Sequence, residues 1–497
     1  MAMPNLSYNL EENISGLEAR FSEFADVVKR KLQLAGGTQA YISYMDNLSS
    51  RDEIELHLVR PLKMSQHQAW SNAYEGITQT LTTIDFSEST ELEDCMNAVL
   101  SGDTILLIDG YSKALIVSTK GWPGRGVQSA ENEVVVQGSK EAFTETLRTN
   151  TVLVRRRIRD TNLKLRQSVV GRRSRTDIAL MYMEDIARKD ILEELEKRIE
   201  LIDIDAIFDV GYLEQLLEDD WWSPFPQFQT TERPDKAAAS ILEGRIAIFV
   251  DNSPLVLILP ATLNTMMQAA EDYYQSWQAM SMARLLRFAA GFTALSLPAL
   301  YIAISVYHPS MLPTLLINKL AQARKDVPFP AALEIVLMDF AFELLREAGI
   351  RLPGAIGATV GIVGGLIIGQ AAVEAGLVSP IVVIVVAITG LCTFVIPSFQ
   401  LVNGFRVMKY LLIFFASLLG MFGFWIGMLV ILIHLASLKS FGIPYMFPFV
   451  SSSASSYSDL KDSIFRAPLF TLRSRPIFSN PNQKTRQAER RNARTRE

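Results

Sequence analysis

The stretches "GDTILLIDGYSKALIV" (Gly102–Val117) and "GRIAIFVDNSPLVLIL" (Gly244–Leu259) are two versions of one pattern. In each, two short apolar runs flank a turn dipeptide, Asp109–Gly110 in the first stretch and Asp251–Asn252 in the second. Apolar runs on either side of such a dipeptide are typical of a β-hairpin. A second matching pair, "YMDNLSSRD" and "YMEDIARKD", precedes these stretches in the same order and at nearly the same separation.

Two matches in register predict two copies of one α/β module. We expect an N-terminal extension over residues 1–24, the first module over 25–145 and the second over 165–265. A basic connector, residues 146–164, would join them. Its Arg155–Arg157 run is either a surface for lipid headgroups or an acidic partner, or a helix face with partners inside the chain. The second interpretation is the commoner role of a charge run.

The composition of the 497 residues divides the chain into a charged head and an apolar body. Hydrophobic residues make up 49% of the sequence, and charge is sparse over long parts of residues 285–437. The net charge of -5 does not indicate a nucleic-acid partner. Two cysteines exclude a disulfide framework and an all-cysteine metal site. Phosphate-cradle, metalloprotease and dinucleotide motifs are absent, so we expect no enzyme, catalytic residue, metal or cofactor.

The apolar body predicts a membrane protein whose transmembrane domain spans residues 285–440 and holds about four to six helices. Four segments reach the roughly 20 apolar residues that a span needs, namely about 286–307, 355–378, 380–402 and 408–437. A juxtamembrane helix over residues 266–284 should precede them. Arg284 and Arg287, beside the first span, place the head in the cytoplasm. Residues 441–497 predict a disordered, basic, cytoplasmic tail.

The stretch "AALEIVLMDFAFELLREAGIRLP", residues 331–353, is apolar but carries several charges. Asp339, Glu343 and Glu347 recur at spacing four, which places them on one face of a helix. We therefore predict an amphipathic helix that lies in the membrane interface or buries its acidic face against protein or water.

The chain resembles the A subunit of the GerA-type spore germination receptors of endospore-forming bacteria. The resemblance covers about residues 35–440 and is carried by seven stretches: "LRTNTVLVRRRIRD", "DIDAIFDVGYLEQLLED", "SPFPQFQTTERPDKAAASILEGRIAIFVDNSP", "EDYYQSW", "HPSMLPT", "VPFPAALEIVLMDFAFELLREAGIRLP" and "IGQAAVEAGLVSP". It implies a multi-pass subunit of the inner spore membrane that acts with a transporter-like B subunit and a lipoprotein C subunit. It also implies a homo-oligomeric ring that forms an ion channel, which releases cations when the receptor complex binds a nutrient.

Two alternatives to a conducting subunit remain open. The chain is either the channel-forming subunit or a non-conducting scaffold that anchors the other subunits in the membrane. The chain could also belong to a group of paralogues that share this domain but have no dedicated role in nutrient sensing, in which case its function is accessory. The stretches quoted above do not separate these cases.

The segment "IGATVGIVGGLIIGQAAVEAG" (Ile356–Gly376) is the candidate conduction helix. Gly357, Gly361, Gly365 and Gly369 recur every four residues, a spacing that allows close helix packing in lipid. A second face of the same helix would line or gate a pore by dewetting. The pore-lining or gate candidates are Thr359, Val360, Val363 and Ile367.

Acidic residues near these helices are candidates for attracting cations. Glu374, one turn after Gln370, would form a ring at a pore mouth near the cytoplasmic end, or would lie at the level of the lipid headgroups. Asp339 and Glu343 have the same possible role, and salt bridges to Arg346 or Arg351 are their plainer explanation. In the head, the candidates for a subunit interface or an internal ion network are Glu232, Arg233, Asp235 and Arg245.

The gate hypothesis makes one prediction from the sequence alone. Replacing Val360 or Val363 with alanine removes apolar bulk from a dewetted constriction, so water and ions should cross more easily. We expect spores that germinate without nutrient, measured by cation release at unchanged protein level. Wild-type behaviour of both variants would place the gate elsewhere.

Overall fold

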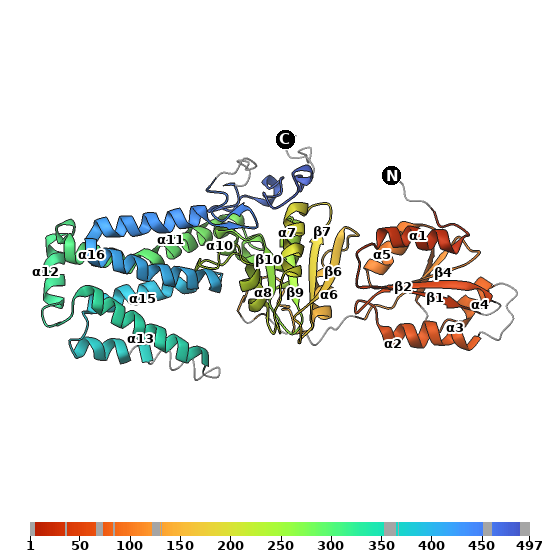
Figure 1. Cartoon of the computed structure of the whole chain (residues 1–497), viewed down its shortest axis with the longest axis horizontal. Helices are drawn as coiled ribbons and strands as arrows, with labels where there is room; N and C mark the ends of the chain where they lie inside the picture. Colours follow the sequence, from red (N-terminus) through yellow and green to blue (C-terminus); the bar gives the residue numbers. More distant parts are fainter. Residues whose placement is uncertain are drawn as a thin grey trace. The chain divides into compact units, whose positions relative to one another are not determined.

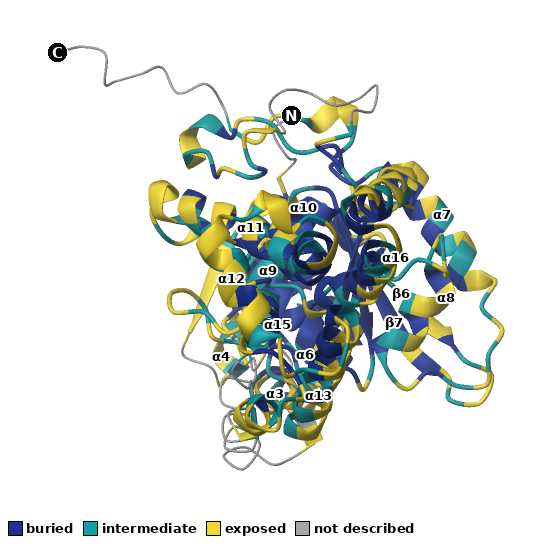
Figure 2. Ribbon diagram, turned by 90° about the vertical axis from the view of Figure 1, so that its left-hand side faces the viewer, coloured by how far each residue is buried: buried dark blue, intermediate teal, exposed yellow. Residues whose placement is uncertain are grey.

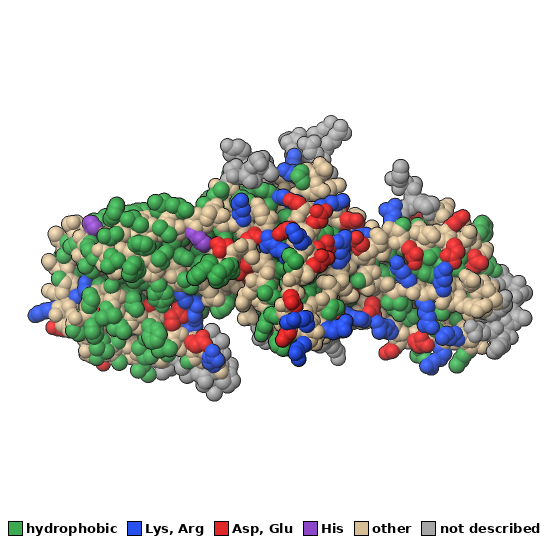
Figure 3. All heavy atoms as spheres, viewed as in Figure 1, with side chains coloured by type: hydrophobic (Ala, Val, Ile, Leu, Met, Phe, Trp, Pro, Cys, Tyr) green, Lys and Arg blue, Asp and Glu red, His purple; other side chains and the backbone are tan. Residues whose placement is uncertain are grey.

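The computed structural model describes residues 5–34, 37–65, 73–82, 85–121, 130, 132–351, 364–365, 367–450 and 460–487. The chain forms two compact units. The first comprises Met1–Glu218, Phe228–Pro260 and Arg473–Glu497, and the second comprises Asp219–Gln227 and Ala261–Leu472. Charged side chains are frequent on the visible face of the first unit, and apolar side chains dominate that of the second (Figure 3).

The first unit contains two five-stranded antiparallel sheets of identical topology. Their strand orders are β1-β2-β4-β5-β3 and β6-β7-β9-β10-β8. The strands of the first sheet are β1 (Val27–Gln33), β2 (Gln39–Met45), β3 (Phe86–Ser89), β4 (Thr104–Ile108) and β5 (Ala114–Val117). Those of the second are β6 (Leu163–Val170), β7 (Thr176–Met183), β8 (Gln229–Thr231), β9 (Ile246–Val250) and β10 (Val256–Leu259). The predicted hairpins are therefore confirmed as β4–β5 and β9–β10.

Helices cover both faces of each sheet. In the first copy, α1 (Leu10–Arg20) and α5 (Leu92–Leu100) lie on one face, and the helices from α2 to α4 lie on the other (Figure 1). These last are α2 (Arg51–Ile54), a π-helical turn (Glu55–Val59), α3 (Arg60–Met64) and α4 (Ala73–Thr80). The second copy has α6 (Leu147–Arg155), α7 (Lys189–Glu200), α8 (Val210–Leu217) and α9 (Pro234–Leu242). Because both faces are covered, the central strands β4 and β9 are buried along their whole length.

Each copy begins with a helix that the predicted boundaries at residues 25 and 165 leave out. The N–H of Ser7, before α1, donates to Asn13 Oδ1 at 2.8 Å, and the N–H of Thr144, before α6, donates to Asn150 Oδ1 at 2.7 Å. In both copies the asparagine amide donates back to the same residue's carbonyl. The repeat therefore includes α1 and α6, and the first half of the predicted basic connector is the first helix of the second copy.

The turn of each hairpin holds the first helix of its own copy. Asp109 Oδ1 accepts from the N–H of Leu10 at 3.2 Å, and Asp251 Oδ1 accepts from the N–H of Leu147 at 3.1 Å. These carboxylates satisfy N–H groups that the first turn of a helix leaves without partners. The aspartate that marks the turn in the sequence therefore also positions a distant helix.

The arginines of the predicted connector have partners inside the chain, as their more conservative interpretation predicts. Arg155 is buried and pairs with Asp26 at 2.8 Å, which joins α6 to the first copy. Arg157 pairs with Glu141 at 2.6 Å. A further link joins the copies where Arg166 contacts Glu23 at 2.6 Å, and this hydrogen bond keeps the pKa of Glu23 below its usual value.

The prediction of a disordered tail is not confirmed for residues 441–450 and 460–487. Residues 473–487 pack on the second copy, where the N–H of Asn480 donates to the Ile186 carbonyl at 2.7 Å. Phe478 is buried beneath the Arg245 guanidinium, 5.4 Å from its ring centre. The tail is basic on average, but it contains apolar residues such as Phe478 that pack against the second copy.

The second unit is helical. It contains α10 (Leu263–Met267), α11 (Trp277–Ile302) extended by a π-helical turn (Ala303–Tyr307), α12 (Thr314–Ala323), α13 (Ala331–Arg351), α15 (Pro380–Phe394), α16 (Phe399–Ser437), residues 367–374 in helical conformation, and the short strand pair β11 (Lys439–Ser440) and β12 (Ile443–Pro444). Among the described residues, two helices are long and apolar enough to cross a membrane, Trp277–Tyr307 and Phe399–Ser437. In Figure 2, α11 and α16 each carry buried residues on one side and exposed residues on the other.

Helix α16 folds back on itself at Gly420, which has φ 62° and ψ -135°. Phe225 contacts both Phe405 and His434, with ring centres 6.0 Å apart in each case. In one straight helix the last two residues would lie about 44 Å apart at 1.5 Å per residue. A Cβ on Gly423 would lie 2.0 Å from the Phe415 carbonyl oxygen, so the two arms touch backbone to backbone. Figure 1 shows the arms side by side.

Three of the predicted helical segments differ from the structure. The predicted span at 380–402 is wrong, because α15 ends at Phe394 before Pro397 and a new helix begins at Phe399. The predicted span at 408–437 is divided at Gly420. The separate juxtamembrane helix at 266–284 is also not found, since α11 runs from Trp277 through Arg284 into the apolar segment.

Helix α13 changes the direction of the chain that follows it. It starts beside the N-terminus of α15, where the N–H of Ser379 donates to Glu334 at 2.9 Å. A Cβ on Gly376 would lie 3.4 Å from the carbonyl of Asp326, in the connection between α12 and α13. Glu374 therefore lies at the same end of the unit as the connection between α12 and α13. Of the two alternatives predicted for this helix, the buried Asp339 agrees with an acidic face that packs against protein.

The turn in α16 generates a stability prediction. A Cβ on Gly420 would lie 2.6 Å from Tyr307 Cγ, and its backbone conformation is one that L side chains rarely adopt. Gly420→Ala should lower the free energy of unfolding of the detergent-solubilised protein by at least about 2 kcal/mol. Gly390→Ala is the matched control, because a Cβ there meets nothing within 4 Å. Equal thermal midpoints for the two variants would contradict the fold-back geometry.

Candidate functional site in the helical unit

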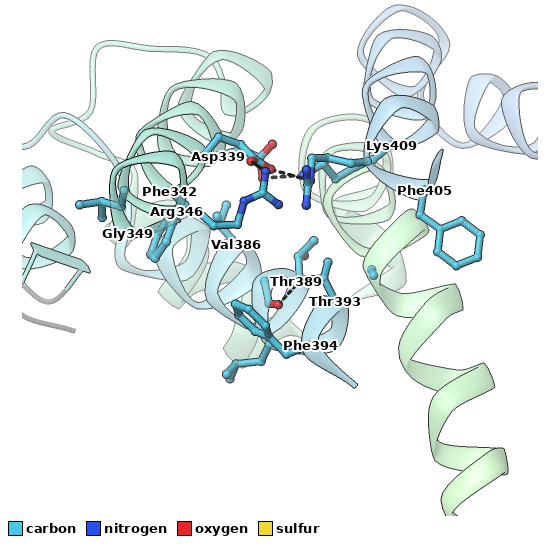
Figure 4. Close-up of a pocket in the computed structure, with 16 residues that line it drawn as sticks. Asp339, Phe342, Arg346, Gly349, Val386, Thr389, Thr393, Phe394, Phe405 and Lys409 are labelled. Atoms are coloured by element: carbon cyan, nitrogen blue, oxygen red, sulfur yellow. Dashed lines mark hydrogen bonds and ion pairs between the residues drawn. The ribbon is translucent and has the colours of Figure 1, made fainter. Parts of the chain in front are cut away.

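A cavity of about 660 Å³ lies inside the helical unit, between α13, α15 and the first arm of α16. Its wall is mostly apolar but contains five charged residues, listed here in chain order: Asp339, Glu343, Arg346, Arg406 and Lys409. Figure 4 shows Asp339, Arg346 and Lys409 pointing toward one another, with Thr389 and Thr393 of α15 nearby. Ionisable groups inside a membrane domain are rare and costly, so this cluster is the candidate functional site.

The centre of the cluster is a buried ion pair. Lys409 Nζ lies 2.7 Å from Asp339 Oδ1, and the two side chains are only 6% and 8% exposed. Asp339 is near the middle of α13, and Lys409 is near the middle of the first arm of α16. The pair fixes the lengthwise alignment of these two helices, because sliding either by one turn would separate the charges.

A second carboxylate is shared between two arginines. Glu343 Oε1 lies 3.0 Å from Arg406 Nε, and Glu343 Oε2 pairs with Arg346 of its own helix. Two atoms of the cluster are buried without a hydrogen-bond partner among the described residues, Asp339 Oδ2 and Arg346 Nε. The cluster thus retains one acceptor and one donor that the described protein does not satisfy.

Two further acidic residues are buried near the ends of helices. Glu334 at the start of α13 is fully buried, contacts Arg324 at 3.3 Å and accepts from the first residue before α15. At the beginning of α11, Asp272 pairs with Arg284 at 2.7 Å and with Arg287 at 2.8 Å. Arg284 and Arg287 are therefore buried within the unit and neutralised by a carboxylate, which weakens the charge argument that used them to orient the head.

The described part of the predicted conduction helix lies beside this site. A Cβ on Gly365 would lie 3.7 Å from Phe342 of α13, and one on Gly369 would lie 3.4 Å from Val383 of α15. Ile367 is 58% exposed. Gln370 Nε2 donates to the exposed Glu374 at 2.9 Å. The other candidates, Thr359, Val360, Val363, Gly357 and Gly361, lie outside the described residues.

The four residues predicted in the head have partners within the first unit, and all except Asp235 are buried. Arg233 pairs with Asp235 at 2.6 Å, and Glu232 accepts from the N–H groups of Asn132 and Glu133 at 2.6 Å. Arg245 donates to Gln229 at 2.7 Å and to the Pro260 carbonyl at 2.9 Å. These contacts form an internal polar network, which is one of the two alternatives predicted for the four residues.

Sequence reasoning missed the basic half of the site. Arg406 lies between two predicted spans and Lys409 lies at the start of the last one. Neither was predicted as a site residue, although each has an acid on α13 as partner. Sequence reasoning also missed Gly423 and Gly427, where a Cβ would lie 2.0 Å from Phe415 and 2.9 Å from Leu412. Their spacing of four was visible in the sequence and is the one that permits close helix approach.

Comparisons with known proteins agree over almost the whole chain. Residues 15–478 match the family model described as Bacillus/Clostridium GerA spore germination protein. Spore germination protein GerLA of Bacillus cereus is 35% identical over 482 residues, covering 97% of each chain. Spore germination protein KA of Bacillus subtilis (strain 168) is 37% identical over 487 residues, covering 97% of this chain and 89% of that one.

The chain is also similar to a membrane protein without a stated function and to one solved domain. An uncharacterized membrane protein of Bacillus subtilis (strain 168), YfkQ, is 41% identical over 471 residues, covering 95% of this chain and 91% of that one. Among solved structures, the N-terminal domain of the A subunit of the Bacillus megaterium spore germinant receptor GerK3 is 34% identical. It covers 53% of this chain and 99% of that domain, with a TM-score of 0.43.

The buried pair generates a prediction with an internal control. Lys409→Met leaves Asp339 buried without its cation and should cost about 3–5 kcal/mol of stability. The double variant Asp339→Asn, Lys409→Met removes both charges and should recover part of that loss. Arg351→Gln, which breaks the exposed pair with Glu347, should change stability by less than about 1 kcal/mol. Thermal unfolding in detergent measures all three, and a double variant no more stable than Lys409→Met would contradict the pairing.

Proposed function

Because this chain belongs to the Bacillus/Clostridium GerA family of spore germination proteins, we propose that it is the channel-forming A subunit of a nutrient germinant receptor. Several copies would enclose a water-filled path that releases cations when the receptor complex binds nutrient. The family membership supports the role in germination. The conducting role is supported by one surface of the helical unit.

That surface is the exposed side of residues 367–374. Ile367, Gln370 and Glu374 are all exposed, and their spacing of three and four residues places them on one face of the helix. The opposite side, which carries Gly369, packs against α15. A helix in the apolar unit therefore presents a carboxamide and a carboxylate outward from its own chain.

Lipid is an unfavourable neighbour for this face. An acidic residue costs about 2.5–3.5 kcal/mol at the centre of a membrane helix, and less near an end. Water shared between several copies removes the cost, because each Gln370 and Glu374 would face an aqueous axis. A ring of carboxylates also attracts cations. An axial water path therefore accounts for an exposed face that mixes apolar and acidic side chains.

The partners of this proposal follow from the resemblance. The chain would assemble as a homo-oligomeric ring in the inner membrane of the spore, together with a transporter-like B subunit and a lipoprotein C subunit. Membrane lipid would cover the remaining exposed apolar residues of the unit, among them Ile384, Phe414, Trp425 and Leu429. The head and the C-terminal segment would lie on the cytoplasmic, or core, side.

Cysteine accessibility tests the proposed water path directly. In a background without the native Cys95 and Cys392, Gln370→Cys should react with a charged, membrane-impermeant thiol reagent when the protein is in membranes. Phe414→Cys is the matched control, because Phe414 is exposed on an apolar arm of α16. We expect at least a tenfold difference in labelling rate. Equal, slow labelling of both positions would reject the water path.

Charge at the same face should then affect conduction. Glu374→Gln removes the proposed cation-attracting carboxylate, so cation flux through the reconstituted receptor should fall severalfold at constant protein level. Glu347→Gln removes an exposed acid that already pairs with Arg351 and should leave flux unchanged. Unchanged flux in Glu374→Gln would contradict the proposal that Glu374 faces the pore.

One comparison favours a second candidate function. The 41% identity to YfkQ, a membrane protein without a stated function, fits an accessory paralogue or a non-conducting scaffold that supports the receptor complex. In that case Gln370→Cys would be protected in membranes, and loss of the chain would reduce the amount of its partner subunits without abolishing cation flux through them.

A further inference from the structure

We propose that the charged cavity of the helical unit is a binding site for an anionic amphiphile. The acid group of the ligand would lie against Arg346 and Arg406, and its apolar body would lie along the wall formed by α13 and α15. This site is separate from the exposed face assigned to conduction, and its argument does not depend on conduction.

The charge balance of the cavity favours an anion. The wall holds three cations and two carboxylates, and each carboxylate already contacts a cation: Asp339 contacts Lys409, and Glu343 is shared between Arg346 and Arg406. The cluster therefore carries one excess positive charge. An unmatched charge in a medium of low polarity is costly, and an anion between the two arginines removes that cost.

A residue of the cavity wall, Arg346, also has an unpartnered donor. Arg346 Nε is buried and has no hydrogen-bond partner among the described residues, while another nitrogen of this guanidinium is paired with Glu343. The free edge of an arginine matches the geometry of carboxylate and phosphate oxygens. Figure 4 shows Arg346 extending from α13 into the group formed by Asp339 and Lys409. The other unsatisfied atom, Asp339 Oδ2, accepts, and a hydroxyl or water beside the acid group supplies its donor.

The rest of the wall suits an apolar body. The cavity is lined by apolar side chains of α13, Phe342 and Leu345, and of α15, Val386, Leu391 and Phe394. Its volume of about 660 Å³ is within the range of about 300–1,000 Å³ that holds small ligands. A fully polar anion would leave these side chains against empty space or water, so the combination of an acid group with an apolar chain fits best.

Glycine keeps one side of the cavity open. Gly390 of α15 lines it, and a Cβ at this position would meet nothing within 4 Å. A larger side chain can therefore enter the space without displacing a neighbour. This gives a variant that fills the site and leaves its charged residues in place.

The same chemistry has two sources, a free medium-chain carboxylic acid and an anionic membrane lipid. The full chain, purified in an uncharged detergent, is incubated with radiolabelled octanoate or with phosphatidylglycerol, and bound ligand is counted. Octanol and phosphatidylcholine are the controls with the same apolar parts and no net charge. Binding of octanoate with no retention of phosphatidylglycerol identifies the free acid as the source. Retention of phosphatidylglycerol identifies the lipid.

Three variants locate the binding. Arg346→Gln removes the unpartnered donor, and Gly390→Leu fills the cavity. Arg346→Gln should weaken binding of the acidic ligand about tenfold or more, the loss expected for a charge-assisted hydrogen bond. Gly390→Leu should weaken it by at least as much, because the leucine occupies the space of the ligand. Arg351→Gln, on the same helix but in an exposed pair outside the cavity, should bind as the unaltered chain does. Elution volume and thermal midpoint establish that each variant is folded.

The proposal fails if octanol competes as well as octanoate, because the acid group would then contribute nothing. It also fails if folded Gly390→Leu and Arg346→Gln proteins both retain full binding of either acidic probe. Because ligand binding is measured without any flux, a chain that conducts no cations leaves this result unaffected.

Discussion

The pairing of Lys409 with Asp339 is the constraint on which the helical unit depends. A membrane interior gives a single ammonium or carboxylate no water to solvate it, so each must meet its opposite. Helix α13 carries too many charges to be stable in lipid alone, and the first arm of α16 carries a lysine and an arginine near its middle. Only one alignment of these helices matches the charges, and that alignment leaves the cavity between them.

The same rule recurs at the boundaries of the other elements. Asp272 holds Arg284 and Arg287 where α11 begins, and Asp26 holds the buried Arg155 where the two copies of the head meet. Each of these three buried arginines is matched by an acid on another element. Ion pairs in this chain therefore act mainly as joints between elements, and they set which helix lies beside which.

The sequence predicted the features that rest on local chemistry. Asp109–Gly110 and Asp251–Asn252 identify both hairpins because a turn dipeptide between apolar runs has few alternatives. The leading helices α1 and α6 were not predicted as part of the repeat because both precede the stretches that match in sequence. Ser7 with Asn13 and Thr144 with Asn150 were also not recognised as one hydrogen-bonding pattern.

The misses in the candidate site have a common physical cause. Asp339 and Glu343 were identified, but their partners on α16 are about 70 positions away, and pairing at such distance is set by packing. The turn at Gly420 carries neither proline nor polar residues, so the apolar run around it predicted one continuous span. Phe478 was hidden in a tail whose average composition is basic and serine-rich.

That turn also has a consequence for how the protein enters a membrane. A single glycine connects the two arms of α16, and the Tyr307 hydroxyl donates to the Ser417 carbonyl beside it. Such a connection provides no hydrophilic loop that could be exported on its own while the second arm waits. We therefore expect the insertion machinery to release both arms together, as a preassembled hairpin, after residues up to the end of α16 have been synthesised. Biogenesis of this unit would then proceed by insertion of helix pairs. If translation stalled between Gly420 and Ser437, the first arm of α16 would lack the second arm, which carries Gly423 and Gly427 and packs against it.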